Sequence, residues 1–343
     1  MTAQAPPALP SRTLGARGPA VSALGFGGAP LGDLYAPLDD DAAIATVLAA
    51  LDAGVTLVDT SPLYGRGLSE HRVGTALRRR PDVPVVLSTK VGRVFAPAPG
   101  GVLRTEGYAG GLPHEGRFDY SYDGAMRSVE QSMLRLGVAS LDVALIHDID
   151  PWTHGEAAAA RQREALAGAW RALVDLKAQR VVRAIGIGVN DADVCERFAR
   201  EADLDCVMLA GRYSLLEQPA LDRFLPLAQA RGSGVMAGGV YNSGILATGP
   251  VEGARYNYRP APPDVLSRVA AIERVCASHG VVLAHAALAF VLGHPAVSSV
   301  VLGAVSPDEV RRNVAAFRAP VPAGLWRDLK AERLLRDDVP VPA

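Results

Sequence analysis

Cysteine is scarce in this chain: three of its 343 residues are cysteines, Cys195, Cys206 and Cys276. Their number is odd, and no two of them stand in a CxxC pattern. This usage predicts reduced thiols, as in a cytosolic protein, rather than a disulfide framework. It gives no support to a thiolate metal site, so no bound metal is expected.

An excess of charge of one sign is also lacking. The chain has 35 Lys and Arg against 36 Asp and Glu, which gives a formal net charge of −1. Because no basic field would attract phosphate backbones or anionic lipids, neither a nucleic-acid partner nor a membrane partner is expected.

Long apolar runs are the third absence. No segment reaches the roughly 18 uninterrupted apolar residues of a membrane-spanning helix. The opening MTAQAPPALPSR lacks the apolar stretch of about seven or more residues found in a signal peptide. We therefore expect a cytoplasmic protein.

What the chain does have is a repeated pattern of short apolar runs rich in Val, Ile and Leu, each followed by a stretch with helical periodicity. Hydrophobic residues make up 49% of the chain, enough for a substantial core. The alternation is typical of a parallel sheet covered by helices, and about eight such units predict an α/β fold, a (β/α)8 TIM barrel. The predicted strands are residues 24–28, 55–59, 85–90, 141–147, 184–188, 206–210, 235–239 and 298–303.

The helices predicted between these strands include residues 41–53, 69–80, 125–136 and 161–179, with Asp or Ser near their starts as caps. No Pro-rich or Ser-rich linker divides the body, so residues 11–336 are predicted to form a single barrel domain. Residues 1–10 and 337–343 are predicted to be disordered tails.

Two stretches exceed a minimal barrel. Two short runs around GARGP, within residues 12–24, predict an N-terminal hairpin that covers the bottom of the barrel. Residues 93–122, after the third predicted strand, are rich in Gly, Pro and aromatic residues. Long loops in compact domains are usually functional or disordered, and we favour a lid over the active site.

Four ionisable residues fall at the carboxyl ends of the predicted strands, where the active sites of such barrels are built. Asp59 ends the second strand, Tyr64 lies in the loop after it, Lys90 ends the third strand and His147 ends the fourth. Each has a structural explanation when taken alone. A lysine that completes an apolar strand is the sharpest anomaly, because its burial is costly unless it is paired, and Asp59 is its natural partner.

The four residue types together favour proton transfer coupled to hydride transfer. A phenol with a pKa near 10 is a poor proton carrier at neutral pH, and a neighbouring ammonium would lower that pKa by stabilising the phenolate. Tyr64 is thus predicted to be the acid or base, Asp59 to hold Lys90, and His147 to orient the substrate oxygen. An aldolase that forms a Schiff base on Lys90 is an alternative from another class.

The order of the motifs DTSPLYGRGLSEHRVG, STKVGR, LIHD, AIGIGVN, GRYSLLEQ and SVVLGAVSPDEVRRN resembles the aldo-keto reductase superfamily over about residues 12–335. The resemblance implies a (β/α)8 barrel that binds NAD or NADP without a separate nucleotide-binding domain. It also implies that Asp59, Tyr64, Lys90 and His147 form the catalytic tetrad. A regulatory subunit that binds nucleotide without turnover remains a competing interpretation.

The resemblance further implies a set of cofactor-binding residues along the barrel mouth. Tyr213 would stack on the nicotinamide, Asn313 would face the adenine, and Ser243, Gly244 and Leu246 would wrap the pyrophosphate. Two positions depart from the family pattern, which has a Ser-Asn pair where this chain reads IGIGVN and a Gln where it has Ala210. The remaining candidates for cofactor contact are Gly27, Gly28, Asp59, Asn190, Gly303 and Glu309.

The choice of nucleotide is predicted from the last motif. Family members specific for NADP meet the 2′-phosphate with a Lys and an Arg, positions that correspond here to Gly303 and Glu309. A carboxylate near the ribose would repel a phosphate, so NAD is predicted, with NADP as the alternative and Arg311 and Arg312 as the cations that would favour it.

The substrate is predicted from HDIDPWTHG and from the long insertion, which resemble the aldose 1-dehydrogenase branch of the superfamily. The implied reaction oxidises the anomeric carbon of a cyclic sugar to a lactone. Trp152 would face the sugar ring, and His114, Asp119 and Asp148 would bind its hydroxyls beside Tyr64 and His147. The alternatives are oxidation of pyridoxal and a general NADPH-dependent aldehyde or ketone reductase.

Overall fold

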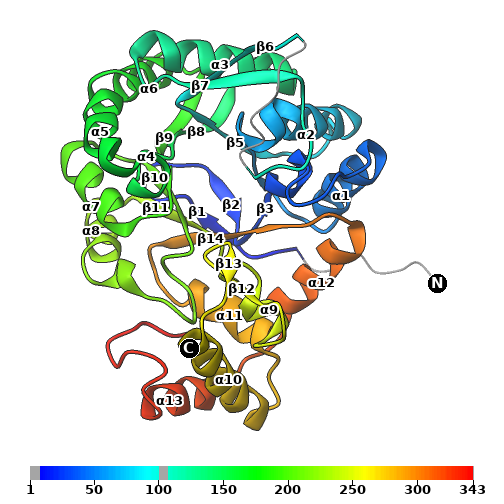
Figure 1. The fold of residues 1–343 in the computed structure, drawn as a ribbon, viewed down its shortest axis with the longest axis vertical. Helices are drawn as coiled ribbons and strands as arrows, with labels where there is room; N and C mark the ends of the chain where they lie inside the picture. Colours follow the sequence, from blue (N-terminus) through cyan, green and yellow to red (C-terminus); the bar gives the residue numbers. More distant parts are fainter. Residues whose placement is uncertain (1–7, 100–106, 343) are drawn as a thin grey trace.

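Eight parallel strands close into a barrel in the computed structural model, which describes residues 8–99 and 107–342. Each pairs in parallel with its neighbours, in the order β10-β11-β14-β3-β4-β5-β8-β9 (Figure 1). All eight correspond to the predicted runs. They are β3 (Leu24–Gly27), β4 (Leu57–Asp59), β5 (Val86–Val91), β8 (Leu141–His147), β9 (Val182–Val189), β10 (Cys206–Ala210), β11 (Gly234–Gly238) and β14 (Val297–Gly303).

Helices surround the barrel and cover the outward faces of the strands (Figure 1). They are α1 (Asp40–Asp52), α2 (Leu68–Arg79), α3 (Tyr122–Leu136), α5 (Ala158–Ala167), α6 (Ala169–Ala178), α7 (Ala192–Glu201), α8 (Phe224–Arg231), α11 (Leu283–Leu292) and α12 (Pro307–Arg318). Shorter or additional elements are η1 (Ala29–Gly32), η2 (Tyr64–Gly67), α4 (Pro151–His154), η3 (Gly155–Ala157), η4 (Pro219–Leu221), α9 (Ile245–Thr248), β12 (Arg255–Tyr256), β13 (Arg259–Pro260), α10 (Pro263–Ser278) and α13 (Ala323–Ala331).

Side-chain caps account for several helix starts. Asp39 accepts hydrogen bonds from the backbone N–H groups that open α1, and Ser121, Asp191 and Ser306 do the same for α3, α7 and α12. These bonds satisfy donors that a helix N-terminus otherwise leaves unpaired.

The helix predicted over residues 161–179 is wrong in one respect, because it is divided into α5 and α6 at Gly168. There Ala169 N donates to Tyr120 O at 2.8 Å. A Cβ on Gly168 would lie 2.6 Å from that same oxygen. The two backbone segments approach so closely here that the helix is interrupted and only glycine fits at position 168.

The N-terminal hairpin pairs β1 (Ser11–Thr13) with β2 (Ala20–Ser22), as predicted. Leu14 and Val21 are fully buried and belong to the same apolar cluster as Leu57, Val143 and Leu145, which come from barrel strands. The hairpin therefore closes the bottom of the barrel and leaves the carboxyl ends of the strands as its open mouth.

The stretch after β5 contains a second hairpin, β6 (Arg93–Pro97) with β7 (His114–Phe118). The chain between its strands lies in part outside the described residues. Where it is described again, Tyr108 forms a bridge with Leu34, Ala109 N donates to Asp33 O, and Leu112 N donates to Gly65 O. The insertion is thus attached to the two loops that follow β3 and β4.

Part of each predicted disordered tail packs on the body. Residues 1–7 and 343 lie outside the described part, but Leu9 is buried and Pro10 O accepts a hydrogen bond from Ala23 N. At the other end Val339 is buried in the core, and its carbonyl accepts a hydrogen bond from Lys330 Nζ. Apolar burial thus keeps both segments on the body.

Within the described ranges, no single helix is long and apolar enough to cross a membrane. Only α10 and α11 taken together satisfy length and composition, with a bend of 94° between them. In this fold α11 lies against β14 of the barrel.

Candidate active site

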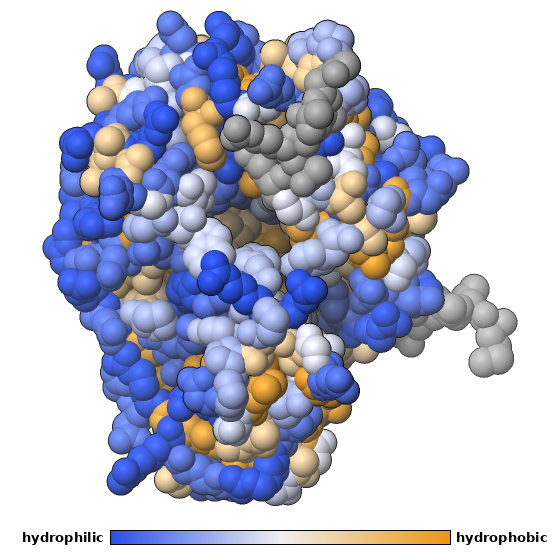
Figure 2. All heavy atoms as spheres, viewed as in Figure 1, coloured by the Kyte–Doolittle hydropathy of each residue, from blue (hydrophilic) through white to orange (hydrophobic). Residues whose placement is uncertain are grey.

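A cavity of about 740 Å³ opens at the barrel mouth, and residues from all eight barrel strands line it. Figure 2, in the same view as Figure 1, shows the hollow near the middle of this face. The predicted residues Asp59, Tyr64, Lys90 and His147 all line this one cavity. The parallel strands bring them together because their carboxyl ends meet at one end of the barrel.

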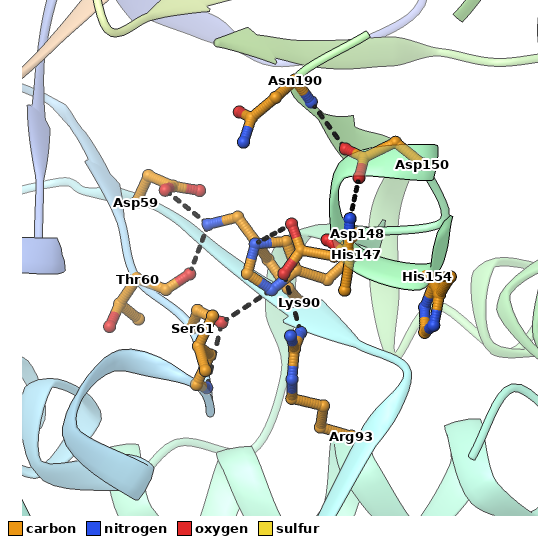
Figure 3. Close-up of polar contacts among 12 residues, drawn as sticks. Asp59, Thr60, Ser61, Lys90, Arg93, His147, Asp148, Asp150, His154 and Asn190 are labelled. Carbon is orange, nitrogen blue, oxygen red and sulfur yellow. Dashed lines mark hydrogen bonds and ion pairs between the residues drawn. The ribbon is translucent and has the colours of Figure 1, made fainter. Parts of the chain in front are cut away.

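Lys90 and Asp59 form the predicted ion pair at the floor of the cavity. Lys90 Nζ lies 2.6 Å from Asp59 Oδ2 and also donates to Thr60 O at 2.8 Å (Figure 3). The other carboxylate oxygen of Asp59 accepts from Ser88 Oγ at 2.7 Å. Both charged side chains are almost completely buried. The pair is thus matched in charge and extensively hydrogen-bonded, which is the condition for burying it.

Tyr64 begins η2, directly after the sharp turn that follows β4. Lys90 Nζ lies 4.8 Å from the centroid of its ring. Burial, reinforced by the charges of Asp59 and Asp148, holds the pKa of Tyr64 well above its usual value. The predicted lowering of the Tyr64 pKa by Lys90 is therefore wrong, and Tyr64 is a neutral phenol at neutral pH.

His147 ends β8 and faces the cavity next to Tyr64, with 6.1 Å between the two ring centroids. Its Nδ1 lies 3.2 Å from Ser61 Oγ, which itself accepts a hydrogen bond from Leu63 N. We assign the imidazole proton to Nε2, which lies 3.4 Å from the carboxylate of Asp148, so that Nδ1 accepts from the Ser61 hydroxyl. Burial, with the charges of Lys90 and Arg93, holds the pKa of His147 well below its usual value. His147 is thus a neutral donor.

An Arg93–Asp148 pair borders His147, and the role of the arginine was not predicted from the sequence. Arg93 Nη1 lies 2.8 Å from Asp148 Oδ2, and Asp148 Oδ1 lies 3.4 Å from His147 Nε2 (Figure 3). Arg93 begins β6, and the centre of its guanidinium lies 4.4 Å from the ring centroid of Phe118 on β7. The hairpin after β5 thus supplies a cation to the active site.

Aromatic side chains form the walls of the cavity. Tyr108, from the insertion, lies with its ring centroid 6.2 Å from that of Tyr64. Trp152 and Tyr258 lie opposite, with 6.4 Å between their centroids. Trp152 was predicted to face the substrate, whereas Tyr35, Tyr108 and Tyr258 were missed because their loops show no periodicity that would locate them.

Several predicted cofactor residues do lie at the mouth. Gly27, Asn190 and Gly303 line the main cavity, and Ser243 lines a smaller pocket beside it together with Asn190 and Trp152. Opposite Tyr64 the cavity is bordered by Gly188, Ala210, Gly238 and Gly239. Such small residues allow a flat ring to approach the backbone, so the residues present fit a nicotinamide.

Three other cofactor predictions fall outside the cavity lining. Gly28 is packed in the loop, where a Cβ would lie 2.7 Å from Ser69 Oγ. Gly244 serves as the N-cap of α9 with φ of 100°, a value that favours glycine, and Leu246 is fully buried in the core. The structure gives these residues packing roles.

Tyr213 is not placed for the predicted stacking. It is buried against Phe290 and His294, with ring centroids 5.3 and 5.5 Å away, and does not line the cavity. The sequence pattern could not separate this core position from a cofactor contact, because both favour an aromatic residue. Asn313 lies on α12, where its amide is 3.4 Å from Gly303 O.

His294, the neighbour of Tyr213, makes folding sensitive to acid. Burial lowers its pKa to about 4, and its Nδ1 accepts a hydrogen bond from Ala296 N that protonation would remove. As the pH falls, the unfolded chain binds this proton at a higher pH than the folded chain does. The contribution of His294 to the free energy of unfolding is therefore fully present above about pH 6.5 and is lost as the pH falls toward 4. We expect about 2 kcal/mol less stability at pH 5 from this group. Urea unfolding at pH 7 and pH 5 measures this loss of stability. His294→Gln should reduce the pH dependence of the free energy of unfolding, and the control His285→Gln should leave it unchanged. The same pH dependence in both variants would contradict the assignment to His294.

The substrate predictions divide in the same way. Trp152 and Asp148 line the cavity. His114 lies on β7, where its Nδ1 is 3.2 Å from Arg66 O, and Asp119 accepts a hydrogen bond from the Ser121 hydroxyl at 2.5 Å. Neither lines the cavity, so both substrate predictions are wrong for this geometry: His114 lies at the loop end of the hairpin and Asp119 follows its base.

Comparison with known proteins agrees with this geometry. The profile described as the Aldo/keto reductase family matches residues 23–331. The chain belongs to this family. It is therefore an oxidoreductase, and aldo/keto reductases use nicotinamide cofactors.

Two relatives match over nearly their full length. A pyridoxal 4-dehydrogenase of Microbacterium luteolum is 41% identical over 94% of this chain and 97% of its own. A D-threo-aldose 1-dehydrogenase of a Pseudomonas species is 39% identical over 93% of this chain and 96% of its own. Among solved structures, the holo form of aldo-keto reductase AKR11C1 from Bacillus halodurans has a TM-score of 0.74 at 27% identity, covering 96% of this chain and 98% of that one.

Proposed function

We propose that this aldo/keto reductase oxidises the hemiacetal carbon of an aldose to a lactone, with NAD as the hydride acceptor. The observation that carries the proposal is the meeting of Tyr64, Lys90, Asp59 and His147 in one cavity, where the last three are buried and Tyr64 is half-buried. The 39% identity to a D-threo-aldose 1-dehydrogenase supports the substrate class, of which L-fucose, D-arabinose and L-galactose are examples.

The reaction removes a hydride from the hemiacetal carbon and a proton from its hydroxyl, and leaves a carbonyl. A bound oxidised nicotinamide supplies the hydride acceptor and one positive charge. His147, neutral with its proton on Nε2, donates a hydrogen bond to the substrate oxygen and orients it. Tyr64 first loses its phenolic proton to solvent, and the ammonium of Lys90, 4.8 Å from the ring centroid, stabilises the phenolate. The phenolate oxygen of Tyr64 then takes up the hydroxyl proton of the substrate and becomes a neutral phenol.

The same geometry argues against a Schiff-base mechanism on Lys90. Its Nζ is held by Asp59 Oδ2 and Thr60 O as a buried ammonium. A protonated amine is not a nucleophile.

Pyridoxal is the second candidate substrate. It closes to a cyclic hemiacetal through its neighbouring hydroxymethyl group, so the same chemistry would apply. The 41% identity to a pyridoxal 4-dehydrogenase and the aromatic walls formed by Tyr108, Trp152 and Tyr258 favour it.

The proposal is tested by following NAD reduction with L-fucose, D-arabinose, L-galactose and pyridoxal. Turnover of the sugars supports the aldose assignment. Turnover of pyridoxal alone would replace the substrate while keeping the chemistry, and no turnover of any of the four with NAD or NADP would contradict the proposal.

Glu309 is expected to favour NAD over NADP. It lies in the first turn of α12, where its carboxylate accepts a hydrogen bond from Val305 N at 2.9 Å. If the adenosine ribose binds at this turn, the charge repels a 2′-phosphate by about 1 kcal/mol for a half-exposed group. Glu309→Gln should therefore lower the ratio of kcat/KM for NAD to that for NADP by about three- to tenfold. The matched control is Asp308→Asn, whose charge is paired closely with Arg311, whereas Glu309 lies 3.9 Å from Arg312. A wild type that prefers NADP, or an equal shift in both variants, would contradict this role.

A further inference from the structure

We infer that Asp148 is the residue that selects the substrate, by binding the hydroxyl on the carbon next to the one that is oxidised. The inference rests on the proposed aldose function and names the hydroxyl group of the sugar that the cavity recognises.

The backbone at Asp148 is held in an unfavourable conformation. Asp148 directly follows β8, and its φ of 52° lies in the left-handed region. Its N–H donates to Gly188 O at 3.0 Å. The hydroxyl of Tyr120, a fully buried residue, lies 2.8 Å from His147 O and 3.1 Å from Asp148 O. Strain that the surroundings maintain at a cavity wall indicates that the side-chain direction matters, and here it aims the carboxylate into the cavity.

The carboxylate of Asp148 is held in place, but not all of its hydrogen-bond acceptor positions are occupied. Arg93 occupies one oxygen at 2.8 Å, and His147 Nε2 lies 3.4 Å from the other. Two carboxylate oxygens offer about four acceptor positions, so acceptors remain for a ligand. Asp59, the other carboxylate among the described residues that line the cavity, has both oxygens bound, by Lys90 and Ser88.

The carboxylate of Asp148 also acts electrostatically on the tyrosines that line the cavity. Burial is the main cause of the raised pKa of Tyr64, Tyr108 and Tyr258, and the charge of Asp148 raises the pKa of all three further. A carboxylate surrounded by aromatic rings suits a polyhydroxylated ring, whose C–H faces pack on aromatic groups while its hydroxyls donate to the carboxylate.

The position of His147 decides which hydroxyl is bound. The oxygen that loses its proton lies at His147 Nε2, and Asp148 Oδ1 is 3.4 Å from that nitrogen. In a sugar, oxygens on adjacent carbons lie within a hydrogen-bond length of each other. The hydroxyl on the carbon next to the reacting one is therefore the group that reaches Asp148.

The experiment compares D-arabinose with 2-deoxy-D-ribose, which is the same pentose without that hydroxyl. We expect wild-type kcat/KM to favour D-arabinose by about 10- to 100-fold, as for one hydrogen bond to a charged group. In Asp148→Ala the preference should fall to within about threefold, through loss of activity on D-arabinose. Asp148→Asn keeps an acceptor for Arg93 and guards against misfolding; it should show a smaller loss of preference.

Ser61→Ala is the matched control, because it removes the contact to His147 from the other side of the imidazole. It should lower activity on both sugars by the same factor and leave the preference unchanged. If Asp148→Ala behaves like Ser61→Ala, Asp148 only positions His147 and the inference is overturned, while the proposed function stands. Equal wild-type activity on the two sugars overturns it as well. Absence of turnover with any sugar defeats the proposed function and the inference together.

Discussion

Replacing Tyr64 with phenylalanine is expected to lower kcat for sugar oxidation by about 10²- to 10⁴-fold, the usual contribution of a positioned acid or base. The variant removes only the hydroxyl that takes up the proton. Since the ring remains in the cavity wall, KM should stay within about threefold of the wild-type value. Steady-state kinetics with NAD and the best of the test sugars measure both constants.

Tyr108→Phe is the matched control for this variant. Tyr108 is a second tyrosine of the cavity wall, with its ring centroid 6.2 Å from that of Tyr64. Tyr108 belongs to the insertion after β5. The tyrosine over whose ring Lys90 Nζ lies is Tyr64. Equal losses of kcat in the two variants would show that the cavity needs phenol groups in general and would remove Tyr64 from its catalytic role.

The pH profile adds a second readout for Tyr64. Burial holds its pKa well above the usual value, so the phenol is protonated at neutral pH and must lose its proton to accept another. Wild-type kcat for oxidation should therefore rise with increasing pH, and the residual activity of Tyr64→Phe should lack this rise.

The barrel, and the meeting of the four candidate residues at its mouth, could be predicted because both depend on local sequence. Parallel strands covered by helices are buried on both faces, so each strand is a short continuous apolar run, and all eight runs were identified within a few residues. Asp59 and His147 are the last residues of β4 and β8, and Lys90 is the last but one of β5. Knowing where a strand ends is enough to place its last side chain at the barrel mouth.

The loop residues could not be predicted in this way. His114 and Asp119 belong to the same insertion as Tyr108, yet only Tyr108 lines the cavity. The difference arises from pairing of the insertion with the loops after β3 and β4, through Leu34, Asp33 and Gly65. Such contacts between distant segments leave no periodic signal in the sequence.

The predicted direction of the Tyr64 pKa shift was wrong for an electrostatic reason. The sequence indicated a lysine near the phenol, but not how completely its charge is compensated. Asp59 Oδ2 lies 2.6 Å from Lys90 Nζ, so Tyr64 experiences the field of a pair rather than that of a free ammonium. Desolvation of the phenolate then dominates.

The same pair gives the second large expected effect. Lys90→Met leaves the carboxylate of Asp59 buried without its cation, which should cost about 3–5 kcal/mol in the free energy of unfolding and abolish turnover. The double variant Asp59→Asn with Lys90→Met removes both charges, so it should recover most of that stability and none of the activity. Urea unfolding of the two variants separates the cost of an unpaired charge from the loss of catalysis.

Lys177→Met provides the comparison from elsewhere in the fold. Lys177 Nζ also lies close to a buried carboxylate, that of Asp205, at 2.5 Å, but Asp205 keeps Arg17 and the backbone N–H of Ile185 as further partners. The loss should therefore be about 1 kcal/mol or less. If Lys90→Met were no less stable than Lys177→Met, Asp59 would not be a buried anion that depends on Lys90. If the double variant retained turnover, the phenolate of Tyr64 would not need the ammonium. The catalytic role of Lys90 therefore requires that the double variant show no turnover.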